Sequence, residues 1–326
     1  MMKLNEIEKF APFCLSCLGR AFGKIGFGLD NRERGIEILN QLEIKEDNEL
    51  QDLLISEESD CTICEGLISE IPNFRELVLE SFSDFSISSF KIGTIVDKDI
   101  LKREVEFQLL FGDDLGEALK SQLNREIGIS VYKKARIEAL MDNPDAVAII
   151  DTGYDVVNLE IKSLFIEGNY NKYDRTVPQT RWPCHSCKGI GCGKCNNTGQ
   201  LYPDSVQSLI ANHFIIASSC SEDLFHGMGR EDIDAAMLGS GRPFVLELRM
   251  PKNRNLDLLE IEKKVNTENK GRIKASKFKF VKRPRVAELK NTVCDKTYRV
   301  DVSISDKISI ESLKKGAQRL TSTVIE

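Results

Sequence analysis

Eight of the ten cysteines in this 326-residue chain stand in four pairs, and within each pair two residues separate the cysteines. The pairs are Cys14 with Cys17, Cys61 with Cys64, Cys184 with Cys187, and Cys192 with Cys195. A gap of two residues lets both thiolates of a tight turn face one tetrahedral ion, and two such pairs complete the four-sulfur shell of a structural zinc site. The spacing therefore predicts about two structural zinc ions.

The third and fourth pairs fall within twelve residues, where Gly189, Gly191 and Gly193 permit the sharp reversals of a small zinc knuckle. The first two pairs are about forty residues apart. They must close a larger loop, and their pairing with each other is inferred rather than read from the spacing. His185 lies inside the knuckle, but four cysteines already complete the shell, so we interpret it as a bystander.

Disulfide bonds are one alternative use of these cysteines, and a thioredoxin-like redox pair is another. The first residues include Glu6 and Glu8 and no apolar run, unlike a signal peptide. No stretch approaches the roughly 18 apolar residues of a membrane span. We therefore expect a cytoplasmic protein, and disulfides are rare in that compartment. Four pairs in one chain also favour metal binding over a single redox site.

Charge is distributed unevenly along the chain. Residues 1–180 carry 20 basic and 34 acidic side chains, and residues 181–326 carry 25 and 17, so the two parts have net charges of −14 and +8. A basic part suits a polyanion, because neutralised phosphates supply the sequence-independent share of RNA affinity. The alternative is that the charged faces are only solvated. With 41% hydrophobic residues, the chain is long enough for two or three folded domains.

Hydrophobic periodicity predicts an α+β protein with four consecutive segments. We expect a zinc-organised segment over 1–72, a compact α/β module over 73–180, the second zinc knuckle over 181–200, and an α+β domain over 201–326. The expected helices are 115–127, 205–217, 256–266 and 310–320, and the expected strands are 146–151, 156–165, 244–250 and 298–304.

A glycine-rich stretch of ionisable residues, 225–244, is the main candidate for chemistry. It contains Gly229-Arg-Glu-Asp-Ile-Asp234 and then Gly241-Arg-Pro-Phe244. The four glycines predict a loop that can approach another backbone closely. Taken alone, the same stretch would also suit a surface turn with local ion pairs.

These two motifs resemble those of the archaeal and eukaryotic T-loop pseudouridine synthases, and the resemblance extends along most of the chain. Residues 14–23 resemble the N-terminal zinc motif of this family. Residues 178–184 with 197–203 resemble the second zinc segment of its archaeal members, and residues 296–298 resemble its tyrosine motif. The matching stretches run from near residue 10 to near residue 300.

The resemblance implies a THUMP-like RNA-binding module over 73–180 and a pseudouridine synthase catalytic domain, built on a mixed sheet, over 201–326. It implies the T loop and T arm of tRNA as the partner. Family members isomerise uridine 55 there and, in archaea, often uridine 54. Because the reaction is an isomerisation, we expect no organic cofactor and no small-molecule substrate, and we expect no membrane partner.

Within the loop, the resemblance assigns the catalytic aspartate to Asp232, which acts at the ribose C1′ while the base is detached and turned. It implies that Arg230 fills or supports the gap that the extruded nucleotide leaves in the base stack, and that Tyr298 stacks on the extruded uracil. A base cannot turn inside a stacked loop, so it must first leave the stack. Asp234 is the nearest competitor for the catalytic role, and Arg242 is expected to contact RNA.

A run of basic residues without an acidic one predicts a further RNA-binding surface. Its eight members are Lys270, Arg272, Lys274, Lys277, Lys279, Lys282, Arg283 and Arg285. In a strand, the lysines would share one face and neutralise phosphates. Phe278 and Phe280 would take the opposite face, where we expect them in the core. The alternative is a solvated edge strand.

The chain departs from the family pattern in two respects. Ala236 stands where arginine is usual and Met228 where a smaller residue is usual. Family members also continue past the position of Glu326 into a segment that carries the basic partner of the aspartate, so we expect this chain to bind tRNA but to be slow or inactive. The alternative function is a non-catalytic zinc-containing tRNA-binding protein. A third interpretation takes the Cys-x-x-Cys-x-Gly-x-Gly run at 184–191 as the zinc domain of a J-type co-chaperone. It is disfavoured because the fourfold repeat of this unit and the His-Pro-Asp turn of that family are absent.

Overall fold

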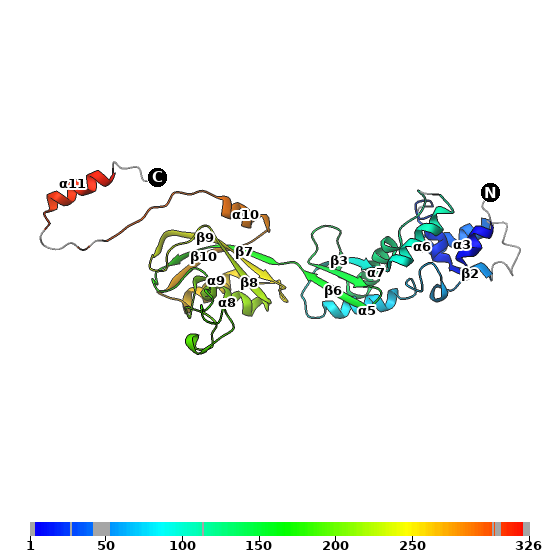
Figure 1. Cartoon of the computed structure of the whole chain (residues 1–326), viewed down its shortest axis with the longest axis horizontal. Coiled ribbons are helices and arrows are strands. Elements are labelled where there is room, and N and C mark those ends of the chain that lie inside the picture. Colours follow the sequence, from blue (N-terminus) through cyan, green and yellow to red (C-terminus); the bar gives the residue numbers. More distant parts are fainter. Residues whose placement is uncertain are drawn as a thin grey trace. The chain divides into compact units, whose positions relative to one another are not determined.

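The computed structural model describes residues 4–26, 28–41, 53–112, 114–301, 303 and 308–321 (Figure 1). The chain divides into two units, residues 1–290 and residues 291–326. The first unit contains, in chain order, a cysteine-bearing N-terminal segment, an α/β module and an α+β module. The predicted α+β class is therefore confirmed.

Short elements form the N-terminal segment around the first two cysteine pairs. They are α1 (Leu4–Ile7), η1 (Glu8–Phe10), β1 (Phe13–Cys14), α2 (Leu15–Arg20), α3 (Asn31–Gln41), β2 (Ile55–Ser56) and η3 (Glu58–Asp60). β1 pairs with β2 in parallel, so the first cysteine pair lies beside the stretch that leads into the second. The backbones of α2 and α3 touch, because a Cβ atom on Gly19 would lie only 1.7 Å from the main-chain oxygen of Asn31.

The α/β module follows. Its elements are α5 (Ile71–Phe82), β3 (Ser89–Ile95), α6 (Lys98–Leu109), α7 (Leu119–Ala135), β4 (Glu138–Ala139), β5 (Ala146–Asp151) and β6 (Val156–Ile161). The sheet order is β4-β3-β5-β6; β3 runs parallel to β4 and β5, and β6 is antiparallel to β5. α7 buries Leu119, Leu123, Ile127 and Val131 at intervals of four residues. This single apolar stripe packs on α5 and β3.

The α+β module has one sheet of order β10-β7-β9-β8. All pairings of its described strands are antiparallel, which corrects the mixed sheet that the resemblance implied. Its elements are β7 (Leu164–Lys172), η4 (Gly193–Cys195), α8 (Val206–Ser218), β8 (Glu222–Gly227), β9 (Met237–Arg249), α9 (Leu258–Glu268), β10 (Ile273–Val281) and α10 (Pro284–Asn291). Alternate residues of β9 face opposite sides. Phe244 packs in the cluster that contains residues of α8 and α9, whereas Val245 packs with Leu289 of α10. Helices thus cover both faces, and the loop 228–236 joins two neighbouring strands.

Several element boundaries differ from the predicted ones. The strand at 146–151 is confirmed, but the helix expected at 115–127 begins at Leu119 and continues to Ala135. β7 pairs with β9 and β10, so the sheet of the α+β module begins near residue 164 and not after residue 180. Residues 238–243, which were expected in a loop, belong to β9, and Arg242 and Pro243 pair with Tyr170 and Asn169 of β7.

The second unit is described by itself. Its helix α11 (Ile310–Thr321) agrees with the helix predicted at 310–320. Of the strand predicted at 298–304, residues 298–301 and 303 are described and are not in a strand, and the other residues lie outside the described residues. No helix in the described parts of the chain is long and apolar enough to cross a membrane.

Candidate active site and metal centres

The four cysteines of the first cluster come from two distant stretches of chain and meet in a buried position. The Sγ atoms of Cys14, Cys17, Cys61 and Cys64 all lie within 4.8 Å of one another, and those of Cys17 and Cys61 are 3.6 Å apart. Zn–S bonds of about 2.3 Å in a tetrahedron separate sulfur ligands by about 3.8 Å. The spacing fits zinc, and the inferred partnership of the first two pairs is present in the structure.

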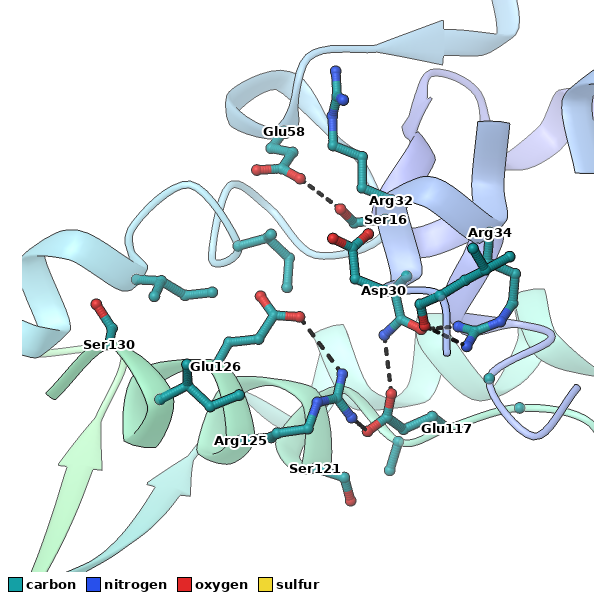
Figure 2. Close-up of a pocket in the computed structure, with 18 of the residues that line it drawn as sticks. Ser16, Asp30, Arg32, Arg34, Glu58, Glu117, Ser121, Arg125, Glu126 and Ser130 are labelled. Atoms are coloured by element: carbon teal, nitrogen blue, oxygen red, sulfur yellow. Dashed lines mark hydrogen bonds and ion pairs between the residues drawn. The ribbon is translucent and has the colours of Figure 1, made fainter. Parts of the chain in front are cut away.

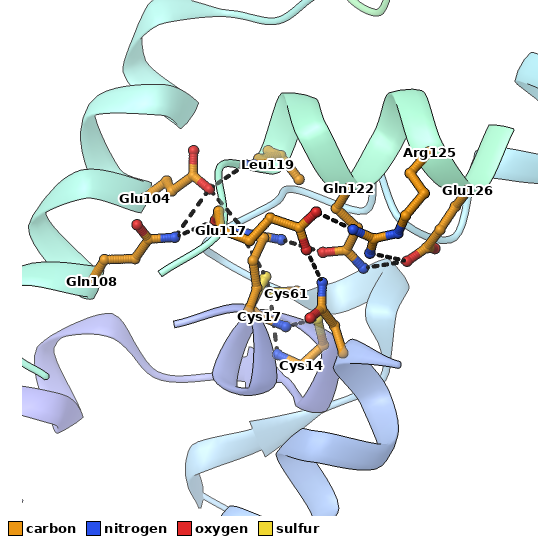
Figure 3. Close-up of polar contacts among 12 residues, drawn as sticks. Cys14, Cys17, Cys61, Glu104, Gln108, Glu117, Leu119, Gln122, Arg125 and Glu126 are labelled. Carbon is orange, nitrogen blue, oxygen red and sulfur yellow. Dashed lines mark hydrogen bonds and ion pairs between the residues drawn. The ribbon is translucent and has the colours of Figure 1, made fainter. Parts of the chain in front are cut away.

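A buried arginine, Arg20, joins this cluster to the helices of the α/β module. Figure 3 shows Glu104 and Gln122 on these helices. The Arg20 side chain is 1% exposed and donates from Nη2 to Cys17 Sγ at 3.4 Å. It also donates from Nε to Glu104 Oε1 at 3.0 Å and from Nη1 to Gln122 Oε1 at 3.1 Å. Burial raises the pKa of Glu104, and the charge of Arg20 offsets this only in part. Arg20 is placed to balance the negative charge of a four-thiolate zinc shell.

The second cluster forms a compact knuckle of Cys184, Cys187, Cys192 and Cys195, whose Sγ atoms also lie within 4.8 Å of one another. The sulfur of Cys195 is 3.8 Å from those of both Cys187 and Cys192, which again fits a tetrahedral zinc. The N–H of Gly199 donates to this sulfur at 3.3 Å. His185 is exposed and outside the cluster.

The two ends of the knuckle run side by side and present two aromatic rings. The N–H of Leu201 donates to the oxygen of Trp182 at 2.8 Å, and the N–H of Cys184 donates to the oxygen of Gly199 at 2.7 Å. The rings of Trp182 and Tyr202 meet edge to face with centroids 5.7 Å apart. We call these two residues the aromatic pair.

A hollow of about 660 Å³ lies between the aromatic pair and the loop that joins β8 to β9. Its lining residues are Trp182, Tyr202, Arg230, Glu231, Asp232, Ile233 and Asp234. The guanidinium carbon of Arg230 lies 4.6 Å from the centroid of the Trp182 ring, a cation–π distance. The hollow therefore brings together three residues that the sequence singled out: Arg230, Asp232 and Asp234.

The side chain of Asp232 is available to a ligand. Asp232 is exposed, and among the residues that the structure describes its carboxylate has no hydrogen-bond or ion-pair partner. Its main chain, in contrast, is fixed. The ammonium group of Lys172, fully buried on β7, donates to the main-chain oxygen of Asp232 at 3.0 Å and to that of Ile233 at 2.8 Å.

Lys172 uses all of its donors. Its third proton goes to the main-chain oxygen of Val177 at 3.0 Å, and an ammonium group has three protons. Burial lowers the pKa of Lys172, while the charge of Glu231, 3.9 Å away, opposes this shift. Only the charged form supplies all three hydrogen bonds, so the loop geometry requires the ammonium ion.

Glu231 is the centre of a second buried group beneath the same loop. The hydroxyl of Tyr170 donates to its two carboxylate oxygens, at 2.9 and 2.8 Å. The Nε atom of Arg242 is 2.9 Å from one of them but out of line for a hydrogen bond, so this contact is an ion pair. Gln179 donates to the Tyr170 oxygen at 2.8 Å and to the main-chain oxygen of Gly229 at 3.0 Å. Burial raises the pKa of Tyr170, and Glu231 raises it further.

The structure corrects the expectation that Arg242 contacts RNA. Its side chain is only 11% exposed, it pairs with Glu231, and it donates to the main-chain oxygen of Met228 at 2.7 Å. The guanidinium group is therefore engaged in holding the loop. Arg20, Tyr170, Lys172, Gln179 and Glu231 were not predicted. One signal was present in the sequence: Tyr170 and Lys172 are two residues apart, so on a strand their side chains point to the same face of the sheet. In the structure both side chains reach the loop from that face.

The eight basic residues of the run 270–285 fall into two groups. Three of them pair with carboxylates: Arg272 with Asp174 at 3.0 Å and Asp204 at 2.9 Å, and Lys279 and Arg285 with Glu167 at 3.2 and 2.7 Å. The other five are exposed and have no such partner among the described residues: Lys270, Lys274, Lys277, Lys282 and Arg283. Only this second group is free to meet phosphates.

The alternation predicted for this strand is interrupted. The register of β10 against β7 shifts between Ser276 and Lys279, and Lys277 takes a left-handed backbone with φ of +62°. Phe278 packs in the core, with its ring 5.2 Å from that of Phe214. Phe280 is 47% exposed, so the expected core position is correct for Phe278 only. Tyr298 belongs to the second unit, where its side chain is 80% exposed, and its role remains a prediction.

A larger hollow of about 1260 Å³ lies in the N-terminal half of the chain (Figure 2). Its charged lining includes both Arg32 and Glu58, and Glu117 accepts a hydrogen bond from Asn31 at 2.9 Å. Burial raises the pKa of Glu126 on the same surface. Because both signs of charge are mixed, the hollow does not favour a polyanion, and its lining includes none of the predicted site residues.

Comparison with known proteins agrees with this organisation. A family model described as "Pus10 THUMP domain, archaeal" matches residues 74–151, and one described as "Pus10, C-terminal" matches residues 165–326. Together the two matches define a THUMP-bearing enzyme of the RNA-modifying class.

Curated relatives carry one name, tRNA pseudouridine synthase Pus10. The protein of Halorubrum lacusprofundi is 33% identical over 97% of this chain and 75% of its own length. That of Methanothermobacter marburgensis is 36% identical over 94% and 74%, and that of Methanopyrus kandleri is 34% identical over 99% and 80%. The chain belongs to the tRNA pseudouridine synthase Pus10 family.

Proposed function

We propose that this chain isomerises uridine to pseudouridine in tRNA, that its target is uridine 55 of the T loop, with uridine 54 as a second target, and that Asp232 is the catalytic aspartate. One observation carries the proposal. The Asp232 carboxylate, in the hollow, has no partner among the described residues, while the main chain of its loop is held at the oxygens of Met228, Gly229, Asp232 and Ile233. A fixed backbone with a free carboxylate is a preorganised catalytic group.

The chemistry needs only this carboxylate and a proton acceptor. The C1′–N1 bond breaks while the Asp232 carboxylate bonds to, or stabilises, the cationic C1′. The freed uracil turns, its C5 atom bonds to C1′, and the C5 proton is lost while N1 gains one. No electrons are exchanged with another molecule, so the isomerisation is balanced without an organic cofactor.

The two cysteine clusters support this function structurally. Zinc held by the first cluster would fix the N-terminal segment, and zinc held by the second would fix the knuckle that borders the hollow. Four thiolates complete each shell and leave no position for a reacting group. The exposed cations of the 270–285 run supply charge for the phosphates of the T arm.

The experiment uses unmodified tRNA transcript, protein in excess over RNA so that slow turnover is detected, and carbodiimide mapping of pseudouridine at positions 54 and 55. We expect a signal at position 55 that disappears when this uridine is replaced by cytidine. Transcript that is bound but carries no pseudouridine would favour the alternative, a non-catalytic tRNA-binding protein.

A further inference from the structure

We propose that the second cysteine knuckle positions a nucleobase-binding subsite next to Asp232, and that the ligand is an unstacked base of a single-stranded RNA loop. The subsite consists of Trp182 and Tyr202, with Arg230 occupying it when RNA is absent. This inference rests on the proposed function, because it describes how RNA enters the same hollow.

The position of the aromatic pair carries the first step. Of the seven residues that line the hollow, Trp182 and Tyr202 are the two that do not belong to the loop of Asp232. Both residues are partly exposed, and their edge-to-face contact sets the edge of one ring against one face of the other, so it does not cover the remaining ring faces. Aromatic faces bind bases by stacking, and they accept every base because each has a π-face.

Arg230 shows where a base would stack. Its planar guanidinium group already lies 4.6 Å from the centroid of the Trp182 ring, which is the kind of contact that a base makes. Arg230 is exposed, and its guanidinium has no carboxylate partner among the described residues, although three acidic residues share its loop. It can therefore leave Trp182 and follow the RNA phosphates when a base takes its place.

The knuckle determines where the aromatic pair lies. Trp182 is held through its oxygen by the N–H of Leu201, and the neighbouring Gly199 donates to the sulfur of Cys195. Gly199 has φ of +70°, and a Cβ atom there would lie 2.3 Å from the oxygen of Gly189, so the backbone closes tightly around the cluster. Loss of the metal would release these turns and move the rings.

The core of the α+β module is separate from these turns. Its buried cluster is built from residues of β7, α8, β9, α9 and β10 together with Val177, and among its described members there is no residue of the knuckle 181–200. Metal at the second cluster is therefore expected to control the aromatic pair, and with it RNA binding, while the sheet beneath Asp232 remains folded.

Binding of two RNA probes to the full chain tests the subsite: a T-arm hairpin with its loop, and a duplex with the same number of phosphates. Trp182 is the single tryptophan of the chain, so its fluorescence reports directly on the subsite. We expect the hairpin to quench this fluorescence and the duplex to leave it unchanged.

Variants then distinguish base stacking on Trp182 from electrostatic attraction to the RNA phosphates. Trp182→Leu should raise the Kd for the hairpin about tenfold or more and leave that for the duplex unchanged, whereas Trp182→Phe should retain most of the affinity. Leu201→Ala is the matched control, since it removes a side chain of the knuckle that does not line the hollow and keeps the backbone bond to Trp182.

Cys187→Ser tests the link to the metal. We expect one zinc ion less per chain, a changed emission of Trp182 in the free protein, and a hairpin Kd raised as in Trp182→Leu. The melting temperature of the main unfolding transition of the α+β module should remain unchanged. An unchanged hairpin Kd in this variant would refute control by the metal.

The subsite itself is refuted if Trp182→Leu leaves hairpin binding unchanged, or if it weakens hairpin and duplex equally. These outcomes are independent of turnover. A chain that binds the hairpin through Trp182 but forms no pseudouridine contradicts the proposed function only. A chain that forms pseudouridine, with hairpin binding insensitive to Trp182→Leu, contradicts the subsite only.

Discussion

The ammonium nitrogen of Lys172 lies 3.0 Å from the main-chain oxygen of Asp232, on the buried side of the loop and not in the hollow. A buried cation that donates to the backbone of the proposed catalytic residue fixes its main chain without neutralising the carboxylate. Family resemblance led us to expect a basic partner for the carboxylate itself. The structure shows a basic residue of β7 acting on the main chain.

Replacement of Lys172 by methionine should slow pseudouridine formation at least tenfold while the Kd for tRNA stays within a few-fold. Three main-chain oxygens would lose their donor, and Glu231 would lose a cation, so the free energy of unfolding should fall by about 2–4 kcal/mol. Single-turnover rates and denaturant unfolding measure the two effects. The control is Lys263→Met, which removes an exposed charge of α9 outside the run 270–285. A normal rate in Lys172→Met would show that the loop does not need this support.

Arg20 should increase the zinc affinity of the first cysteine cluster. We expect about two zinc ions per chain, and in Arg20→Met one of them should bind about 10–100-fold more weakly, because the hydrogen bond to Cys17 and the charge that balances the thiolates are lost. Competition with a chromogenic chelator measures this affinity. Arg20→Lys should restore part of it, and Arg32→Met, at an exposed position, should have no effect. Two sites of unchanged affinity in Arg20→Met would contradict this role.

The sequence was informative where chemistry is encoded locally. Cysteine spacing predicted both clusters because a two-residue gap already places two sulfurs on one ion. The loop motif likewise placed Arg230, Asp232 and Asp234 in one hollow, since they lie within five consecutive residues.

Contacts across the sheet could not be predicted in this way. Lys172 reaches the loop only because β7 pairs with β9, sixty or more residues later in the chain. The same pairing draws Arg242 inward onto Glu231, and for this reason its expected RNA contact was wrong. Lys277 has a left-handed backbone conformation at the point where the register of β10 shifts, and no feature of the basic run predicts this.

Glu167 and Arg285 should make part of the stability dependent on pH. The hydrogen bond from Arg285, at 2.7 Å, lowers the pKa of Glu167 below its ordinary value. A lowered folded-state pKa stabilises the protein fully above the unfolded-state pKa, about 4.3, and this stabilisation is lost as the pH falls through the folded-state value. Arg285→Met should therefore lower the melting temperature at pH 7 by more than at pH 3, with a loss of about 1 kcal/mol or less. Arg283→Met is the control, and equal losses at both pH values would contradict the linkage.

Salt should weaken tRNA binding steeply. Five exposed residues of the 270–285 run have no carboxylate partner among the described residues. If each neutralises one phosphate, the slope of log affinity against log salt is about −4, at roughly 0.7–0.9 per contact. Lys274→Gln with Lys277→Gln should reduce the slope by about 1.5. Lys279→Gln, whose charge is already paired with Glu167, should change it less. An affinity independent of salt would exclude this surface.

Asp232→Asn should abolish pseudouridine formation and leave tRNA affinity within a few-fold. Asparagine keeps the shape of the side chain but cannot bond to C1′ as an anion or stabilise a cationic sugar, whereas the phosphate contacts that supply most of the affinity lie elsewhere. Asp234→Asn is the matched control, because Asp234 lines the same hollow and is also exposed. It should retain most of the rate. Carbodiimide mapping and filter binding measure the two quantities. If Asp234→Asn forms no pseudouridine and Asp232→Asn does, the roles within the loop are reversed. If both variants form pseudouridine, the loop is not the catalytic site.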